Sequence, residues 1–382
     1  MILENEYLTR DINGFVCYHP AMGMEDEKEE ASSLQAIADV REFVKISHSK
    51  YGHAVRGAHA KAYGGVIAEI EIYKNLPEAY AQGIFAFPAK YESVLRFSNG
   101  KAHLGPDHLL GGVVGIGLKI LGVPGATLLE PENSLGNVDL VMVNSPVFAA
   151  NDVQTYLNIQ RLSFEVSSRE MAFYNLLSSF GSLPPEKWLW ENFFAFLRLG
   201  QLPVQNVLLS TYWTMAPSRF GKYVAKLSIV PLISSAEKVT SKKPMENPYP
   251  EFFHESLKQE IASHDYEFEI CAQLCRDPQR MPIDRVTVEW PESLSPPVPV
   301  ARIRIPMQNL ISEDIIDRLS MNPWRVPEEH MPIGSIQRIR KRVYQSSADQ
   351  RHRMNGQPDL EPCTLSDLFK QELINYWSKK KL

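Results

Sequence analysis

The chain has 382 residues, of which 44% are hydrophobic and 22% are charged. This composition is typical of a globular protein that is long enough to bury a large core. The net charge of -5 excludes the strongly basic surface on which most nucleic-acid binding depends, so no nucleic-acid partner is expected.

Targeting signals and cysteine usage are both unremarkable in this sequence. No segment approaches the roughly 20 consecutive apolar residues needed to span a bilayer, and no signal peptide is predicted at the acidic N-terminus. Cys271 and Cys275 form a C-x-x-x-C pattern within an alternating segment. This spacing favours two thiols on one strand face over a metal site or a disulfide. A cytoplasmic location is therefore expected.

The N-terminal part of the chain, residues 1–50, is predicted to be an arm that contains a helix. Leu34, Ile37, Val40 and Val44 recur at helical spacing and should share its buried side. Residues 51–382 show no internal repeat and no linker, so we expect them to form one domain.

Eight segments of that domain read as β-strands. They are residues 66–73, 94–98, 112–121, 137–144, 222–230, 265–275, 285–290 and 299–305. Several alternate between two faces with the period of a strand. Eight such strands can close an antiparallel barrel. The predicted fold class is therefore α+β, an eight-stranded antiparallel β-barrel with attached helices.

Two helical regions are expected to attach to the barrel. Residues 152–201 contain an aromatic cluster that includes Trp188, Trp190 and Phe194, which we interpret as helical core. The alternative is the apolar wall of a channel for a hydrophobic substrate. A final amphipathic helix is predicted from residue 365 to about residue 377.

One more helix, over residues 340–355, carries a chemically informative pattern. Arg340, Tyr344 and Arg351 stand at i, i+4 and i+11, so they form one stripe, and Gly356 can end the helix. A phenol between two guanidiniums is suited to holding a tyrosinate, because nearby positive charge lowers the pKa of a phenol. The alternative is a solvated basic helix with one tyrosine.

The stripe resembles the proximal haem helix of the catalase superfamily, in which Arg-x-x-x-Tyr precedes a later Arg. Further blocks resemble this family in the same order. They are Arg56-x-x-His59-Ala-Lys, Arg96-Phe97-Ser98, Gly-Ile-Gly-Leu-Lys over 115–119, and Asp-Leu-Val-Met-Val-Asn-Ser-Pro-Val-Phe over 139–148, followed by Asp152 and Tyr156. The resemblance extends from Arg56 to Asn355 and implies the same barrel fold.

The resemblance implies a haem b cofactor whose iron is bound by Tyr344. It makes His59 the general acid and base that moves a proton during peroxide cleavage. Ser98 would accept a hydrogen bond from the His59 ring and fix its tautomer. Outside this context, a core histidine held by a carbonyl and an ordinary strand-end serine are the alternatives.

The side chains that the resemblance assigns to haem binding are Arg56, Arg96, Phe148, Tyr156, Arg340 and Arg351. Three of the arginines would bind the two propionates, because guanidiniums bind carboxylates strongly when shielded from water. Arg340 would donate to the phenolate, and the two aromatic rings would pack on the porphyrin. Arg353 matches the family only after an insertion, which would rotate the helix face, so Arg351 is preferred.

One position departs from the family in a way that bears on activity. Catalases have a distal Asn that orients hydrogen peroxide, and the gap-free match here is Val143, followed by Asn144. Asn144 is the candidate replacement, but a one-residue offset in a strand turns a side chain to the opposite face. Fast dismutation of hydrogen peroxide is therefore in doubt.

These features predict a haem-dependent oxidoreductase that consumes peroxides and favours organic ones. Two alternatives remain open. One is the rearrangement of fatty-acid hydroperoxides by a dehydratase or lyase, as in short relatives within the superfamily, and the other is haem binding without catalysis. Because catalases are commonly tetramers, a homo-oligomer is a further expectation of the resemblance.

Overall fold

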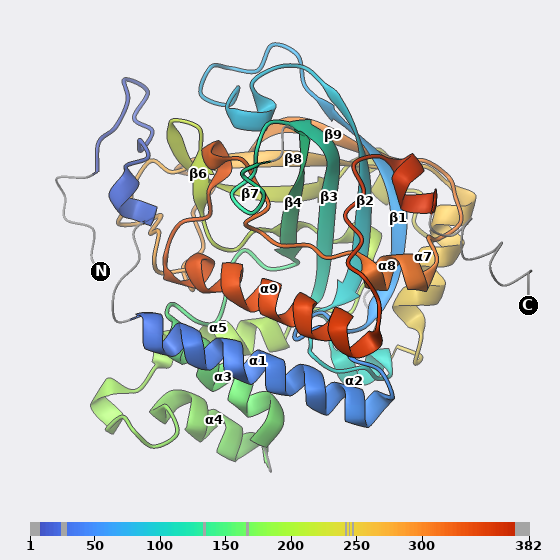
Figure 1. The fold of residues 1–382 in the computed structure, drawn as a ribbon. Coiled ribbons are helices and arrows are strands. Elements are labelled where there is room, and N and C mark those ends of the chain that lie inside the picture. Colours follow the sequence, from blue (N-terminus) through green and yellow to red (C-terminus); the bar gives the residue numbers. More distant parts are fainter. Residues whose placement is uncertain are drawn as a thin grey trace, which may run out of the picture.

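The computed structural model describes residues 8–23, 29–132, 135–165, 168–240, 243, 245–246 and 248–370. A β-barrel forms the centre, and helices lie mainly along one side of it (Figure 1). Nine strands make up the sheet, and all their pairings are antiparallel. They are β1 (Ala62–Ile72), β2 (Lys90–Asn99), β3 (Val114–Pro124), β4 (Leu135–Val143), β5 (Tyr212–Trp213), β6 (Ser218–Phe220), β7 (Tyr223–Pro231), β8 (Tyr266–Leu274) and β9 (Val298–Ile305).

The strand order is β5-β4-β3-β2-β1-β9-β8-β7-β6, and β5 also pairs with β7. Trp213 of β5 lies opposite Val143 of β4, and Tyr212 lies opposite Ile229 of β7. These two pairings close a ring of eight strands, while β6 pairs with β7 outside the ring. The predicted eight-stranded antiparallel barrel is confirmed.

Period-2 alternation determines which side chains fill the barrel. On β8, Tyr266, Phe268, Ile270, Ala272 and Leu274 all have 0% exposure and belong to one large apolar cluster, as their spacing predicts. On β2, β3 and β4 the same alternation directs one set of side chains into this core. The intervening positions therefore point to the outer face of the barrel, where polar residues gather.

One of the eight predicted strands is wrong, and two real strands, β5 and β6, were missed. Residues 285–290 form a turn, in which Val288 N donates to Arg285 O, and no described residue of this segment joins the sheet. Val286 and Trp290 are buried in clusters outside the barrel core, which explains their strand-like alternation. The missed strands β5 and β6 have two and three residues, which is too short for a period to show.

The longer helices are α1 (Glu29–Tyr51), α3 (Val153–Glu165), α4 (Arg169–Ser178), α5 (Trp190–Gly200), α7 (Phe252–Ser263) and α9 (Ser335–Asn355), and the short ones are α2 (Asp107–Leu110), α6 (Ile233–Ala236) and α8 (Glu313–Arg318). Residues 365–370 are also helical, and the rest of the helix predicted to reach residue 377 lies outside the described residues. Among the described helices, none is both long and apolar enough to cross a membrane.

Helix α9, predicted from the Arg340–Tyr344 stripe, lies between the barrel and α1 (Figure 1), and α1 and α3 both contact it. Val40 of α1, Leu157 of α3 and Val343 of α9 share one buried cluster. Gly356 caps α9 in the left-handed conformation with φ +60°, as predicted. Leu34, predicted to lie on the buried side of α1, is 56% exposed, because neighbouring Ala36 packs there instead.

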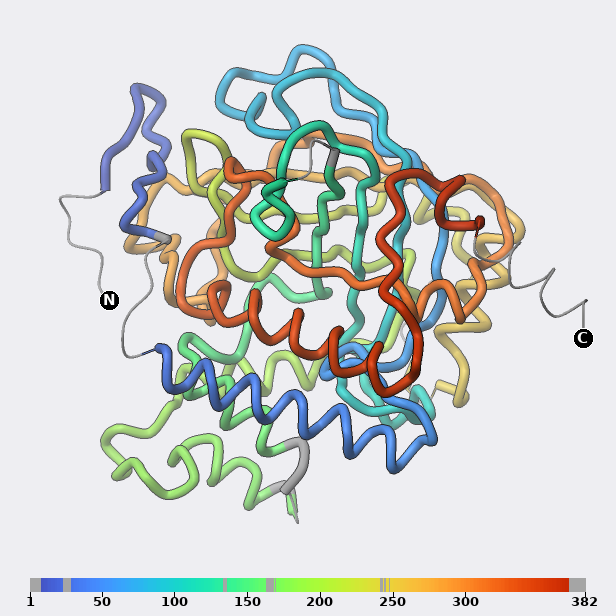
Figure 2. Tube along the Cα trace, in the orientation of Figure 1, coloured from blue at the N-terminus to red at the C-terminus, as the bar shows by residue number. Residues whose placement is uncertain are grey.

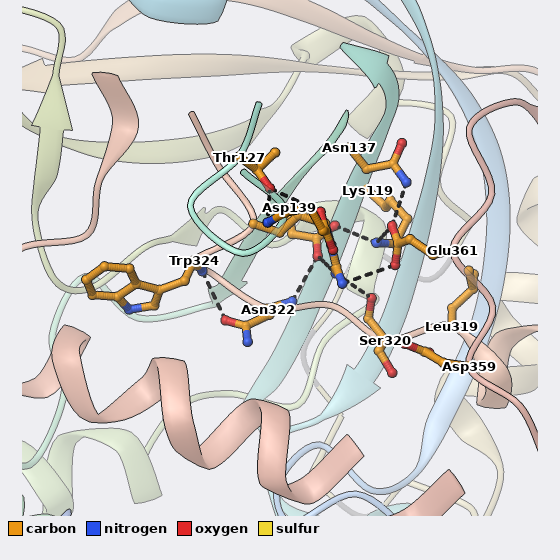
Figure 3. A network of polar contacts seen from close by, with 12 residues as sticks. Lys119, Thr127, Asn137, Asp139, Leu319, Ser320, Asn322, Trp324, Asp359 and Glu361 are labelled. Carbon is orange, nitrogen blue, oxygen red and sulfur yellow. Dashed lines mark hydrogen bonds and ion pairs between the residues drawn. The ribbon is translucent and has the colours of Figure 1, made fainter. Parts of the chain in front are cut away.

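A buried network of charges joins distant segments on the outer face of the barrel (Figure 3). Lys119 of β3 and Asp139 of β4 have fully buried side chains, and Nζ lies 2.9 Å from Oδ1. Arg325 Nη1 is 2.6 Å from the other oxygen of Asp139, and Glu361 Oε1 is 2.7 Å from Lys119 Nζ. Burial raises the pKa of Glu361, and Lys119 opposes that rise.

This network holds two chain segments against the barrel. Asn322 N donates to Asp139 Oδ2 at 2.9 Å, which fixes the segment before α9. After α9 the chain runs back along the barrel (Figure 2), where Asn137 Nδ2 donates to Pro362 O at 2.8 Å. The two connections that flank α9 are thus both attached to β4.

The buried lysine should contribute far more to stability than a surface lysine on the same barrel. We expect Lys119→Met to lower the free energy of unfolding by about 3–5 kcal/mol, because Asp139 and Glu361 lose a shared cation. Lys90→Met is the matched control, since its Nζ pairs with Glu69 in an exposed setting. Urea unfolding monitored by circular dichroism measures both, and equal midpoints would contradict the role given to Lys119.

Candidate functional site

The candidate site is built outward from His59. His59 precedes β1 and has φ +55°, a left-handed conformation that is unfavourable for a residue with a side chain. Arg96 Nη2 donates to the His59 carbonyl at 2.9 Å and helps to hold it there. The ring lies over Gly115 of β3, where a Cβ atom would come within 2.4 Å of His59 Cε1. Glycine at this position therefore makes room for the imidazole.

Ser98 of β2 can determine which nitrogen of the His59 ring carries the proton. Its Oγ lies 3.1 Å from His59 Nδ1 and 3.5 Å from Gly115 O, which can accept the hydroxyl proton. Ser98 can then accept from Nδ1–H, which leaves Nε2 as the basic nitrogen. Burial, reinforced by the charge of Arg96 and opposed by a hydrogen bond to Asn99, lowers the pKa of His59 to about 4. The ring is therefore neutral at neutral pH.

Helix α9 brings together the next predicted pair. Arg340 Nη2 donates to Tyr344 Oη at 3.1 Å, as the i, i+4 spacing predicts. The Arg340 guanidinium lies 5.2 Å from the centre of the Tyr344 ring. Its positive charge also contributes to the low pKa of His59. The distal and proximal groups predicted from the sequence therefore lie near enough for their charges to interact.

Phe148 and Tyr156 lie beside this pair. Their ring centres are 6.3 Å apart, and Gln160 Nε2 donates to Tyr156 Oη at 2.7 Å. Burial raises the pKa of Tyr156, and the nearby phenol of Tyr344 raises it further. Both rings keep partial exposure, so part of each remains free to contact a ligand.

Three predicted arginines gather at the other end of the site. Arg56 Nη1 lies 3.0 Å from Asp317 Oδ1, and Arg351 Nη1 donates to the Asp317 carbonyl. Burial and the charge of Arg56 lower the pKa of Arg351 to about 9 and hold that of Arg96 well below its usual value. The guanidiniums of Arg56, Arg96 and Arg351 therefore repel one another electrostatically.

Part of the hydrogen-bonding capacity of this arginine cluster is unused among the described residues. The Nε atoms of Arg96 and Arg351 are buried and have no hydrogen-bond partner in the described part of the chain. The nearby carboxylate of Asp317 is 47% exposed, which weakens its attraction through solvent screening. A buried cluster of this kind favours an anionic ligand with more than one acceptor.

The structure places Val143, and not Asn144, on the side of β4 that faces His59. Val143 lies directly opposite Gly115, so the two positions share the face on which the imidazole rests. Asn144 Oδ1 accepts from Val114 N at 2.9 Å, and its Nδ2 donates to Gly112 O at 2.8 Å. The catalytic role predicted for Asn144 would require both backbone bonds to break.

Sequence reasoning missed two residues that support the site. Asp317 Oδ1 accepts a hydrogen bond from Arg56 Nη1, and Gln337 Oε1 accepts one from Arg340 Nη1 at 2.9 Å. Gln337 stands three residues before Arg340, so helical spacing could have indicated their contact. No sequence signal joins Asp317 to Arg56, because 261 residues separate them.

Comparisons with known proteins support the fold. No model of a protein family matches the sequence, and no curated protein matches it. Among solved structures, the chain is similar to catalase A from Saccharomyces cerevisiae, with a TM-score of 0.59 and 16% identity over 81% of this chain and 65% of that one. A fungal catalase gives a TM-score of 0.58 and 16% identity over 80% and 61%. A bacterial catalase gives 0.57 and 16% over 82% and 60%.

The fold is therefore catalase-like. The chain spans less than two thirds of the length of each of these catalases. Among the described residues, no group of three or more His, Cys, Asp or Glu side chains could hold a metal ion. Any metal at this site would have to depend on another kind of ligand.

The low pKa of His59 gives a test of this geometry that needs no ligand. Below its ordinary pKa of about 6.5, the unfolded chain binds a proton that folded His59 does not, so stability falls between pH 6.5 and 4. Between pH 7 and pH 5 this loss should reach up to about 2 kcal/mol. His59→Asn should remove it, whereas the exposed control His53→Asn should not. Urea unfolding at both pH values measures the difference, and a wild-type slope retained by His59→Asn would contradict the assignment.

Proposed function

We propose that this chain binds haem between Tyr344 and His59 and consumes peroxides, favouring organic ones. The observation that carries the proposal is a neutral imidazole held by Ser98, a phenol held by Arg340, and two buried arginine Nε atoms without a partner among the described residues. The catalase-like fold supports it independently. We further propose that the protein acts in the cytoplasm as a homo-oligomer, with the peroxide as its small-molecule partner.

The residues of the site fit a haem. A phenolate is a suitable ligand for ferric iron, and Arg340 Nη2 already donates a hydrogen bond to the Tyr344 oxygen that would bind it. Two propionates would supply the anionic acceptors that the buried Nε atoms of Arg96 and Arg351 lack. Phe148 and Tyr156 offer partly exposed rings for contact with a flat macrocycle. A bound haem would supply the redox chemistry that breaks the O–O bond.

His59 would handle the proton in this reaction. Cleavage of R–O–O–H requires the proton on the terminal oxygen to move to the departing R–O oxygen. Nε2 can accept that proton because Ser98 keeps the other nitrogen protonated. The imidazolium then returns the proton to the leaving oxygen, which departs as an alcohol, or as water when R is hydrogen. The low pKa of His59 favours this return.

Val143 supports the preference for organic peroxides. Its side chain is 6% exposed and cannot donate a hydrogen bond to the small, polar hydrogen peroxide molecule. An isopropyl group beside the imidazole instead offers apolar contact to an alkyl substituent. Dismutation should therefore be slow relative to the turnover of an organic peroxide with an electron donor.

The rearrangement of fatty-acid hydroperoxides is a less supported alternative. The aromatic cluster that suggested it belongs to α4, α5 and the segment between them, and Trp190 and Phe194 are 48% and 62% exposed. No contact recorded for the described residues joins these two rings to His59. Allene oxide or aldehyde products from a lipid hydroperoxide would favour this alternative, and haem uptake without any turnover would favour a non-enzymatic carrier.

Haem ligation by Tyr344 can be tested by its absorption. The wild-type protein should bind one haem and give the Soret spectrum of a ferric tyrosinate complex. Tyr344→Phe removes the only proposed protein ligand, so the Soret band should shift or be lost. Tyr174→Phe is the control, because this phenol is 47% exposed on α4. An unchanged Soret band in Tyr344→Phe would overturn the proposed ligation.

The role of Val143 gives a separate prediction. Val143→Asn should increase hydrogen peroxide dismutation by about fivefold or more, since one new hydrogen bond is worth about 1 kcal/mol. Val143→Ala is the matched control, because it enlarges the same place without adding a donor. Oxygen release measures dismutation, and peroxidase turnover with cumene hydroperoxide is followed in parallel. No increase in Val143→Asn, or an equal increase in Val143→Ala, would contradict the role of Val143.

A further inference from the structure

Gln337 is a buried polar residue that contacts Arg340, which in turn donates to Tyr344. Its side chain is 2% exposed, and its Oε1 accepts from Arg340 Nη1 at 2.9 Å. Its Nε2 lies 3.4 Å from Ala216 O and 3.3 Å from Pro217 O. Arg340 uses its other terminal nitrogen to donate to Tyr344. A continuous chain of hydrogen bonds therefore runs from the backbone at residue 216 to the phenol.

This chain of hydrogen bonds has only one possible direction. The carbonyls of Ala216 and Pro217 can only accept, so the NH₂ group of Gln337 must face them. Its oxygen must then face Arg340, where it accepts from the guanidinium. The acceptor given to Arg340 is thus a neutral amide oxygen. A carboxylate there would meet two carbonyl oxygens with no proton between them, which is unfavourable in a buried setting.

Gln337 is itself held firmly by the fold. The indole Nε1 of Trp324 donates to the Gln337 carbonyl at 2.6 Å. Trp324 N in turn donates to Asn322 Oδ1 at 3.0 Å, and Asn322 N donates to Asp139 in the buried charge network (Figure 3). The position of Gln337 therefore depends on β4 of the barrel as well as on its own helix.

We propose that Gln337 is the positioning residue that aims Arg340 at Tyr344 and, being neutral, leaves the charge of the guanidinium available to the phenolate. This inference rests on the proposed function, because Tyr344 matters as a ligand only when haem is bound. A neutral acceptor orients Arg340 without cancelling its charge. A carboxylate acceptor would share that charge, so the phenolate would donate more strongly to ferric iron and stabilise it against reduction.

The surroundings make variants at this position practicable. Gln337 and Arg340 line a small cavity of about 30 Å³, which has room for a water molecule. Water can therefore approach Arg340 when the amide is removed, which limits the cost of losing its acceptor. Substitutions at Gln337 should perturb the direction of Arg340 more than the fold.

The ferric–ferrous midpoint potential of the haem-loaded protein tests the charge argument. Gln337→Glu should shift the potential to a lower value than that of the wild type. Gln345→Glu is the matched control, because Gln345 adjoins Tyr344 on α9 but is exposed, so solvent screens the same added charge. Equal potentials in Gln337→Glu and Gln345→Glu would overturn the inference.

A second variant tests the positioning without haem. Gln337→Met keeps a side chain of similar length but removes the amide, so a crystal structure of the haem-free variant should show Arg340 turned away from Tyr344 Oη. Arg340 remaining within hydrogen-bond distance, near the original 3.1 Å, would overturn the inference. The two proposals fail separately. A wild-type protein that takes up no haem refutes the proposed function, while this structure still decides whether Gln337 positions Arg340.

Discussion

The hydrogen bond from Arg340 to Tyr344 is the interaction on which the site depends. The helix period brings the two side chains together, but the fold decides what they face. Helix α9 is fixed by apolar contact with α1 and α3 on one side. On the other side, the chain before it and the chain after it are both attached to β4 through Asp139 and Asn137. The buried charge network around Asp139 thus helps to fix the position of the Tyr344 phenol.

The outer face of the barrel, and not its interior, carries the candidate site. Most side chains that point inward from β2, β3 and β4 belong to the apolar core. Arg96, Ser98 and Lys119 occupy the alternate positions, and Gly115 leaves room among them for the His59 ring. A closed barrel supplies a rigid wall for such a site because each strand is bonded on both sides. The same strands therefore serve stability on one face and function on the other.

Much of this arrangement could be predicted from local patterns. The eight-stranded barrel follows from a period of two residues, and the Arg340–Tyr344 contact follows from the helical period of 3.6 residues. The end of α9 at Gly356 follows from the ease with which glycine adopts a left-handed conformation. The closed ring has the predicted eight strands, although residues 285–290 are not a strand and β5 and β6 were missed. Residues 285–290 show strand-like alternation because side chains such as Val286 are buried outside the barrel. Strands β5 and β6 have only two and three residues, which is too few for an alternation to show. Contacts that closure creates, such as Arg56 with Asp317, leave no local signal.

Closure through β5 has a consequence for the working molecule. This strand has only two residues, and Val143 and Trp213 form the one residue pair by which it joins β4. The ring therefore has a seam with very few ladder bonds, and transient opening should begin there more readily than between the long strands. Val143 is also the residue that stands on the His59 side of β4. Opening of this seam would therefore loosen the wall beside His59 before it disturbs the rest of the barrel.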